Sequence, residues 1–395
     1  MTPQHEGCGV FFISRGAVCL KFEAKGDRIK YQMIAWRHKV DRLSRIRERL
    51  AQAGLDAALI TDEKNQRYAT GFAFTDGAVV VTRERAFLIT DSRYTEAAQK
   101  TVAEDIAVLR FGAGKSLAER VREVLSECAV QRLGAEEGSL PHGAYLAWEE
   151  SLGMSLLPCQ SIFNELRAAK DEDELASMRL AQSIAESALE DVLGIIRPGV
   201  TERDIAAEIT YRLLKHGGEG NSFDPIAVTG ANSSMPHGVP SDAPVKAGDF
   251  VTMDFGCIKN GYCSDMTRTV AVGCASDEMK KVYDTVLRAQ LAGIEKAAAG
   301  VTGAEIDKAG RDVIAAAGYG EYFGHGFGHS LGLNIHEQPS ASPACKTPMP
   351  CGAVISAEPG IYLPGRFGVR IEDVLVIREG GCDVITKAPK ELLVL

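Results

Sequence analysis

Hydrophobic and polar positions first show a clear period near residue 40. Apolar residues recur at helical spacing among Arg and Glu side chains, at Val40, Leu43, Ile46 and Leu50. One face of a helix repeats about every 3.6 residues, so this spacing predicts an amphipathic helix over residues 40–53 that Gly54 ends. Later apolar runs predict buried strands, and mixed runs predict helices. The predicted strands are 57–61, 78–82 and 86–89, and the predicted helices are 92–101 and 115–125.

This alternation of strands and helices predicts a small α/β domain over residues 33–163. Residues 1–32 show no helical periodicity, so we expect an N-terminal extension there and leave it outside the fold. A charged stretch from Lys170 to Glu174 opens a long helical pattern, and the domain boundary is placed just before it. The second domain is therefore predicted to cover residues 164–395.

Helices and strands are mixed in the second domain. Thr201 with Asp204, and Thr302 with Glu305, have the spacing of a capping box, which predicts the start of a helix at each pair. Helices packed on strands would form an α+β domain. Runs rich in β-branched residues predict the strands near 249–256, 263–272, 353–358 and 369–377.

Composition indicates an ordinary folded protein and narrows its partners. A chain of 395 residues exceeds what one hydrophobic core usually supports, which agrees with two domains. The 53 acidic and 44 basic side chains give a formal charge of -9, which argues against nucleic acid as a partner. The sequence has no run of roughly 18 apolar residues, as a membrane-spanning helix requires, and its start lacks the layout of a secretory signal. We therefore predict a cytoplasmic protein that binds neither nucleic acid nor membrane.

The cysteines do not resemble a disulfide framework. Ten of them are scattered from Cys8 to Cys382, so we interpret them as reduced thiols. Cys257 and Cys263 flank acidic positions, where a metal role is conceivable. Buried thiols are the favoured interpretation, because free cysteine is so often buried.

Two aspartates of the second domain need compensation. Asp254 lies within 250–256, a run with strong strand propensity in which a charge is out of place. Asp265 heads the next predicted strand, with Thr267 and Thr269 as its same-face neighbours. A short connection would bring both carboxylates together, and like charges that close resist joint ionisation unless a cation lies between them. The alternative is a pair of solvated turn aspartates.

Histidines gather in the same domain. Three of them alternate with glycines between residues 324 and 336, and glycine allows tight backbone conformations and close approach of a ligand. A lone histidine would more often be a satisfied core residue, but three in one short segment favour a ligand-binding role. The gathered histidines are His237, His325, His329 and His336.

Two glutamates complete the set of candidates. Glu358 follows an apolar strand, and Glu372 lies among β-branched residues. Buried carboxylates at strand ends need partners. Arg370 is a candidate partner for either one, so a buried ion pair without catalysis is the alternative. Asp373 would point to the opposite face from Glu372 in a regular strand.

Four carboxylates with one imidazole would form a hard, oxygen-rich ligand set without thiolate. Such a set suits two divalent ions with shared bridging ligands and disfavours a structural tetrahedral zinc site. We expect manganese, with cobalt, iron or zinc as the other candidates. Two ions roughly 3.5 to 4 Å apart would polarise a carbonyl group and activate water at neutral pH.

Nearly all of residues 160–395 resembles the pita-bread metallopeptidases, which include methionine aminopeptidase, aminopeptidase P and prolidase. In matching local contexts, the five metal ligands of the family fall on Asp254, Asp265, His329, Glu358 and Glu372. Residues 40–150 resemble the creatinase-type N-terminal domain through Asn65–Phe72 and Asp91–Tyr94. Methionine aminopeptidases normally lack that domain, so the resemblance favours the proline-directed branch.

The resemblance also implies roles for the site residues. His237 would lie over the substrate, and His336 would hydrogen-bond the scissile amide or the tetrahedral intermediate. His325 and Arg370 match substrate-side positions of the proline-directed members. Glu358 would be both metal ligand and general base, and the metals with His336 would stabilise the oxyanion. A homodimer is implied as well.

The predicted activity is hydrolysis of the N-terminal Xaa-Pro bond of dipeptides or short peptides by a metallo-exopeptidase. Aminopeptidase P action on longer Xaa-Pro peptides is the first alternative. A creatinase-like hydrolase, which uses no metal, and a non-enzymatic binding module on the same fold are the others. Both are disfavoured because all five ligand residues are present.

Overall fold

The structure is a computed structural model that describes residues 41–112 and 114–395. The predicted N-terminal extension, residues 1–32, lies outside this part of the chain. Residues from Arg42 to Leu395 group together by their contacts as one unit.

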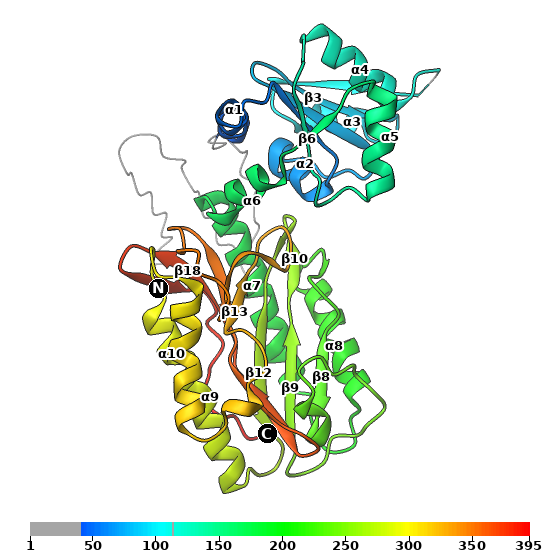
Figure 1. Cartoon of the computed structure of the whole chain (residues 1–395). Helices are drawn as coiled ribbons and strands as arrows, with labels where there is room; N and C mark the ends of the chain where they lie inside the picture. Colours follow the sequence, from blue (N-terminus) through cyan, green and yellow to red (C-terminus); the bar gives the residue numbers. More distant parts are fainter. Residues whose placement is uncertain (1–40, 113) are drawn as a thin grey trace, which may run out of the picture. The chain divides into compact units, whose positions relative to one another are not determined.

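A mixed β-sheet with the strand order β4-β3-β2-β1-β5-β6 forms the middle of the N-terminal part (Figure 1). β2 pairs antiparallel with β1 and β3, whereas the pairs β3-β4, β1-β5 and β5-β6 are parallel. The strands predicted at 57–61, 78–82 and 86–89 are confirmed as β1, β2 and β3. The strands are β1 (Ala57–Ile60), β2 (Gly77–Thr82), β3 (Ala86–Thr90), β4 (Ile106–Arg110), β5 (Leu133–Ala135) and β6 (Leu156–Pro158).

Helices pack on both faces of this sheet. Alternate residues of a strand face opposite sides, so Ala58 and Ile60 join a cluster with α1, while Ala57 and Leu59 join one with α4. The helices predicted at 40–53, 92–101 and 115–125 are confirmed as α1, α3 and α4. The helices are α1 (Arg42–Gln52), α2 (Glu63–Thr70), α3 (Thr95–Thr101), α4 (Leu117–Glu127), α5 (His142–Leu152) and α6 (Gln160–Ala168).

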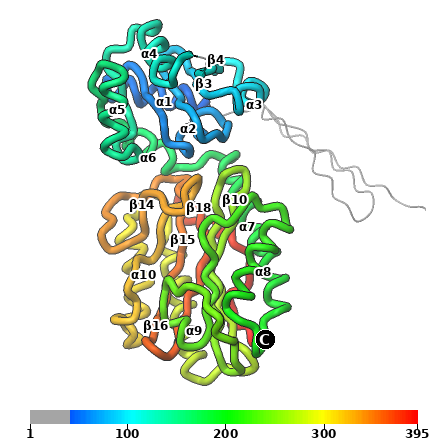
Figure 2. The backbone as a smooth tube through the Cα atoms, turned by 90° about the vertical axis from the view of Figure 1, so that its right-hand side faces the viewer, coloured from blue at the N-terminus to red at the C-terminus, as the bar shows by residue number. Residues whose placement is uncertain are grey.

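Longer helices flank the strands of the C-terminal part. α7 (Glu172–Leu193) and α8 (Glu202–Lys215) share a hydrophobic cluster with β9 (Phe250–Phe255) and β12 (Met266–Ala271). α9 and α10 belong to other clusters, in which they pack on β15 (Val354–Ala357), β17 (Phe367–Arg370) and β18 (Asp373–Arg378). Figures 1 and 2 both show α8 and α10 on opposite sides of the strands. These helices are α7 (Glu172–Leu193), α8 (Glu202–Lys215), α9 (Asp277–Lys296) and α10 (Gly303–Ala316), with short 3-10 helices at Gly230–Ser234 and Gly320–Tyr322.

The strands of this part form several small sheets, with the orders β12-β9-β8, β14-β13-β15-β18-β19, β11-β10-β7 and β16-β17. Helices on these strands give the predicted α+β domain. The strands are β7 (Gly220–Asn221), β8 (Ile226–Thr229), β9 (Phe250–Phe255), β10 (Cys257–Lys259), β11 (Tyr262–Cys263), β12 (Met266–Ala271), β13 (Gly328–Ser330), β14 (Glu337–Ala341), β15 (Val354–Ala357), β16 (Gly360–Leu363), β17 (Phe367–Arg370), β18 (Asp373–Arg378) and β19 (Gly381–Val384).

Two predicted strands are wrong in their extent. The run 263–272 is divided, because Cys263 ends β11, which pairs with β10, while β12 begins at Met266 and pairs with β9. The run 369–377 is not continuous, because β17 ends at Arg370 and pairs with β16, while β18 begins at Asp373 and pairs with β15. Ile371 and Glu372 link the two sheets. The β-branched pattern continues across this link, so it carries no local sign of the break.

Capping boxes start four of the helices in the described residues. The boxes predicted from Thr201 with Asp204 and from Thr302 with Glu305 are present at α8 and α10. Another box joins Asp171 and Glu174 at α7, and a fourth lies at α4. The side chain and backbone hydrogen bonds of a box satisfy N–H groups that the first turn of a helix leaves unpaired.

The cysteines of residues 41–112 and 114–395 are free thiols, as predicted. Cys257 and Cys263 are buried, and burial raises the pKa of the two thiols to about 11 and to about 12. Both are therefore protonated at neutral pH. Within the same residues, no helix combines the length and the hydropathy needed to cross a bilayer.

Candidate metal centre

A tight hairpin brings the two aspartates together. β10 and β11 are joined by Asn260 and Gly261, whose φ values of 50° and 76° are those of a two-residue turn that favours Asn-Gly. β9 and β12 pair so that Asp254 lies opposite Thr267, and Asp265 directly precedes β12. Both carboxylates are buried. The short connection expected between the strands is therefore present, and the alternative of solvated turn aspartates is wrong.

The other two carboxylates meet through strand register. β15 and β18 pair with Ala357 opposite Asp373. Glu358 follows the first of these residues and Glu372 precedes the second, so the two glutamates lie next to each other just beyond the paired strand ends. The backbone N–H of Glu372 donates to the carbonyl of Thr267 at 3.1 Å, which ties this corner to β12.

His329 lies on β13 and faces the carboxylates. Its Nδ1 lies 3.2 Å from the carbonyl oxygen of Ser330. A carbonyl only accepts, so Nδ1 carries the proton and Nε2 presents its lone pair. Nε2 lies 3.3 Å from Oε1 of Glu358 and 3.5 Å from Oδ2 of Asp265. Burial lowers the pKa of His329, which keeps the ring neutral as a metal ligand requires.

Ser356 links His329 to Glu358. Its hydroxyl accepts from the backbone N–H of His329 at 2.9 Å and donates to Oε1 of Glu358 at 3.0 Å. A Cβ atom at Gly328 would lie 2.0 Å from the carbonyl oxygen of Ser356, so only glycine allows β13 to approach this closely. This glycine belongs to the Gly-rich segment in which the sequence predicts ligands.

Ligand atoms of Asp265, His329 and Glu372 lie within 4.8 Å of one another. Glu372 also accepts a hydrogen bond from the hydroxyl of Thr267 at 2.8 Å. Thr267 is thus a supporting residue of the site, and the sequence already places it on the same strand face as Asp265.

Arg370 forms its ion pair with Asp254, at 2.6 Å from Oδ2, and not with either glutamate as the sequence suggests. Its other nitrogens donate to the hydroxyl groups of Tyr362 at 2.8 Å and Thr267 at 3.0 Å. The ion pair that the sequence offers as an alternative to a metal therefore accounts for one carboxylate and leaves the other three unbalanced.

The electrostatics call for added positive charge. Burial, and then the neighbouring carboxylates, raise the pKa of Asp265 and of Glu372 well above their usual ranges. Burial also raises the pKa of Glu358. Oδ1 of Asp254 is buried and finds no hydrogen-bond partner among the described residues. A divalent cation would satisfy this oxygen and allow all four groups to ionise, so the residues present fit a metal site.

All of the predicted site residues line one open cavity of about 570 Å³. His336 is exposed, and its ring meets that of His329 edge to face with 4.3 Å between centroids. His325 lies deeper, with Nε2 2.9 Å from the hydroxyl of Tyr362. His237 is exposed on the segment that includes Val239. The predicted residues brought together are Asp254, Asp265, His329, Glu358, Glu372, His237, His325, His336 and Arg370.

The sequence does not identify Tyr362 or the apolar part of the cavity. Tyr362 is buried and lies between His325 and Arg370, where its hydroxyl contacts both. No charge or glycine pattern marks it in the sequence. The apolar lining comes from Ile226 at the start of β8 and from four loop residues, and their convergence depends on the tertiary fold. The loop residues are Phe223, Pro225, Val239 and Ile335.

Comparison with known families agrees with this geometry. Residues 176–379 match the model of metallopeptidase family M24, and residues 42–169 match that of the creatinase/prolidase N-terminal domain. The chain therefore belongs to metallopeptidase family M24, and this membership implies a site for divalent metal ions. The fold class and the family resemblance predicted from the sequence are confirmed.

Several relatives cover almost the whole described chain. An Xaa-Pro dipeptidase structure from Bacillus anthracis is 41% identical with a TM-score of 0.86, covering 90% of this chain and 99% of its own. An X-Pro aminopeptidase structure from Thermotoga maritima is 35% identical with a TM-score of 0.84, covering 88% and 100%. The Xaa-Pro dipeptidase of Pyrococcus horikoshii is 34% identical over 355 residues, which are 89% of this chain and 99% of the relative.

Proposed function

We propose that this chain is an exopeptidase that hydrolyses the N-terminal Xaa-Pro bond of dipeptides or short peptides with two divalent metal ions. The observation that carries the proposal is an excess of carboxylates around His329 in one open cavity. Among the described residues that line it, Arg370 is the one with a permanent positive charge. The relatives described as Xaa-Pro dipeptidases support this substrate class.

The ions would be held by the two aspartates near β9 and β12, by the two glutamates beyond the paired ends of β15 and β18, and by the imidazole of His329. When bound, they would polarise the scissile carbonyl group and activate the attacking water. We propose manganese, with cobalt, iron or zinc as candidates, because oxygen ligands dominate the set. The proposed ligands are Asp254, Asp265, His329, Glu358 and Glu372.

The remaining residues would bind and orient the substrate and move protons. Glu358, oriented by Ser356, would accept a proton from the attacking water and pass it to the leaving amine. His336 at the cavity mouth would donate a hydrogen bond to the oxygen on which negative charge develops. His237 would hold the substrate from the exposed side of the cavity.

His325 and Arg370 would act on the substrate side through Tyr362. The hydroxyl of Tyr362 lies 2.9 Å from His325 and 2.8 Å from Arg370. Burial lowers the pKa of His325, so its ring is neutral at neutral pH and Arg370 keeps the positive charge. This row of groups would orient the peptide across the ions.

Purified, metal-loaded protein would be compared on Ala-Pro, on Ala-Pro-Ala and on a Met-Ala peptide. We expect the highest kcat/KM on the Xaa-Pro dipeptide. Exclusive cleavage of the Met-Ala peptide would overturn the proline assignment. Failure to bind any divalent ion after reconstitution would overturn the metallopeptidase proposal and favour a creatinase-like hydrolase or a binding module.

Aminopeptidase P activity is the second candidate. The X-Pro aminopeptidase of Thermotoga maritima supports it, because this chain covers that structure completely. Faster hydrolysis of Ala-Pro-Ala than of Ala-Pro would select it.

Two further properties stay predictions, the first from the family resemblance and the second from the composition and charge of the chain. We propose a homodimer and a cytoplasmic location, with no nucleic acid or membrane as partner. Light scattering of the purified protein tests the first property, and cell fractionation tests the second. The division of domains at residues 163 and 164 also stays a prediction, and it falls within α6.

A further inference from the structure

A buried carboxylate closes the loop that carries His336. Glu337 follows His336 and begins β14. Its Oε1 accepts a hydrogen bond from the backbone N–H of Asn334 at 3.0 Å. A Cβ atom at Gly332 would lie 2.9 Å from Oε2. The loop between β13 and β14 therefore folds directly around the carboxylate, without room for a side chain at its inner position.

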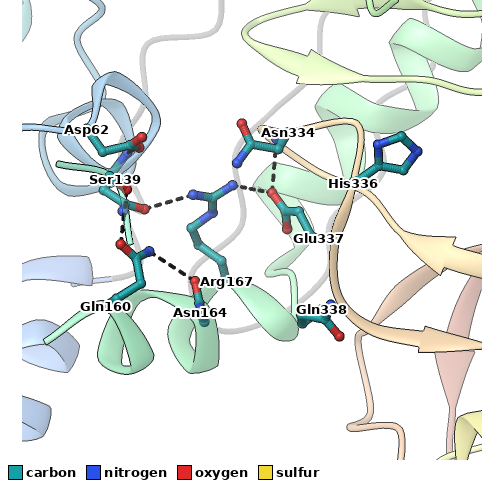
Figure 3. Close-up of a pocket in the computed structure, with 10 residues that line it drawn as sticks. Asp62, Ser139, Gln160, Asn164, Arg167, Asn334, His336, Glu337 and Gln338 are labelled. Atoms are coloured by element: carbon teal, nitrogen blue, oxygen red, sulfur yellow. Dashed lines mark hydrogen bonds and ion pairs between the residues drawn. The ribbon is translucent and has the colours of Figure 1, made fainter. Parts of the chain in front are cut away.

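Two cations meet the same carboxylate from outside the loop. Arg167 of α6 donates to Oε1 of Glu337, and Nζ of Lys170 donates to Oε2 at 3.0 Å (Figure 3 shows Arg167). The three side chains are 6%, 8% and 1% exposed for Glu337, Arg167 and Lys170. Burial alone would raise the pKa of Glu337, but Lys170 and Arg167 lower it to about 2. Glu337 is therefore charged at neutral pH.

Arg167 is itself held by the N-terminal part of the chain. Its second terminal nitrogen donates to Oδ1 of Asn65 at 2.8 Å, and Nδ2 of Asn65 donates to Oε1 of Glu136 at 2.6 Å. Oε2 of Glu136 accepts from the backbone N–H groups of Thr61 at 2.7 Å and Asp62 at 2.9 Å. A continuous row of hydrogen bonds thus runs from the end of β1 to the loop of His336.

His336 lies where this polar cluster meets the metal centre. It lines the cavity of about 570 Å³ around the metal ligands and also the polar pocket of about 190 Å³ around Arg167. Figure 3 shows His336 beside Glu337 and Asn334 on the same loop. The imidazole is exposed, so its place over the site depends on the backbone that carries it.

We propose that Glu337, clamped by Arg167 and Lys170, is a positioning residue that holds His336 over the metal centre. The row through Asn65 and Glu136 orients Arg167 for this task. The inference rests on the proposed function for the chemical role of His336. It assigns the N-terminal part of the chain a task in catalysis that involves no contact with the substrate.

The main test is Glu337→Gln, which keeps the shape of the side chain and removes its charge. We expect kcat to fall about 10- to 100-fold, as when a supporting hydrogen bond of a metal-site residue is lost, with bound metal unchanged. KM should change less than about threefold, because ground-state binding is little affected. Combined with His336→Ala, Glu337→Gln should lower kcat no further, because the group that it positions is gone.

Variants of Arg167 separate positioning from a general loss of packing. Arg167→Lys keeps the charge without the forked geometry, so it should retain more activity than Arg167→Met. The matched control is Arg203→Met, which breaks an exposed ion pair with Asp242 and should leave kcat and KM unchanged. Additive effects of Glu337→Gln and His336→Ala, or loss of metal in Glu337→Gln, would overturn the inference.

A second readout needs no substrate. In zinc-loaded, histidine-labelled protein, Glu337→Gln and Arg167→Met should shift or broaden the imidazole NMR signals that His336→Ala removes. The signals of the exposed His142 in α5 should not move. Unchanged signals of His336 would overturn the inference even if no tested peptide is hydrolysed, so failure of the proposed function and failure of the positioning role remain distinguishable.

Discussion

The candidate metal centre and the cluster around Glu337 are both groups of buried charged side chains. They differ in the number of cationic side chains available to each carboxylate. At the metal centre several carboxylates share Arg370, which binds Asp254. Around Glu337, one carboxylate meets Arg167 and Lys170. The pKa of Glu372 is raised well above its usual range, by burial and then by other carboxylates, whereas that of Glu337 is lowered to about 2 by the two cations despite burial.

Burial alone therefore does not distinguish a structural carboxylate from a metal ligand. The local ratio of fixed cations to carboxylates does, because buried like charges need a compensating ion. Glu337 is satisfied by side chains of the chain itself. The corner formed by Asp265, Glu358 and Glu372 is satisfied only when positive charge is added from outside.

The largest expected effect comes from comparing two adjacent residues, the proposed metal ligand Glu372 and the ion-paired Asp373. Glu372→Gln should remove metal and lower kcat on the order of 1,000-fold, since metal assistance is worth several kcal/mol. Asp373→Asn should keep the metal, because Asp373 pairs with Arg268 at 2.8 Å. Elemental analysis of the purified variants and their kcat on Ala-Pro measure both effects.

Asp373→Asn should instead reduce stability by about 3–5 kcal/mol, as expected when one partner of a buried ion pair is removed. The urea midpoint of the metal-loaded variant measures this loss. Equal metal content in the two variants would show that the balance of charge does not separate their roles.

The next largest effect on the free energy of unfolding should come from removal of the metal. A ligand at 100 to 1,000 times its Kd stabilises a folded protein by about 2.7–4.1 kcal/mol. Chelation should thus lower the thermal midpoint of the C-terminal part, and added Mn²⁺ should restore it. In Glu372→Gln, which lacks a proposed metal ligand, chelation should lower the thermal midpoint much less. In Lys170→Met, which keeps all the proposed ligands, chelation should lower it as in the wild type.

Glu136→Gln should break the row of hydrogen bonds that runs from Glu136 through Asn65 to Arg167, without affecting the metal. The amide of Gln would place a donor against either the backbone N–H groups of Thr61 and Asp62 or the side-chain donor of Asn65. An unsatisfied buried group costs about 1–3 kcal/mol, which denaturant unfolding would detect. Metal content should equal that of the wild type, and a loss of metal would contradict the separation of the two clusters.

The last prediction is a pH dependence of the metal-free protein, which needs no substitution. The folded-state pKa values of Asp265 and Glu372 lie above the usual 3.8 and 4.5, so the folded protein binds protons that the unfolded chain has released. Stability should therefore fall as pH rises above about 4, by up to roughly 1.4 kcal/mol per pH unit for each such proton. Metal-loaded protein should lack this slope. Urea midpoints between pH 5 and pH 8 test the difference, and parallel trends would refute it.

The sequence predicts those features that local pattern alone determines. The helices with complete capping boxes, α4, α7, α8 and α10, are all predicted. By contrast, α9 has Ser276 as its cap but Met279 where the box needs an acid. α2 is not predicted because its buried face includes Asn65 and Gln66, so it has no apolar period. The metal-site residues stand out because each is a charged or imidazole group in an apolar or glycine-rich run.

Partnerships between distant segments are not predictable in the same way. Arg370 is close in sequence to Glu372, yet the pairing of β9 with β12 places Asp254 within its reach. The break at Ile371 and Glu372 depends on which sheet each half joins, and both halves have the same β-branched character. Likewise, nothing near Asn65 in the sequence indicates that it bridges Glu136 and Arg167.

The origin of the two cations at Glu337 bears on how such a chain could arise by joining modules. Arg167 falls inside the stretch that matches the creatinase/prolidase N-terminal domain, and Lys170 lies between that stretch and the match to the peptidase family. A fusion at this junction would have to supply both side chains at once, or leave Glu337 without its partners. The seam between the modules is therefore a place where shuffling or transplantation of domains is restricted by chemistry.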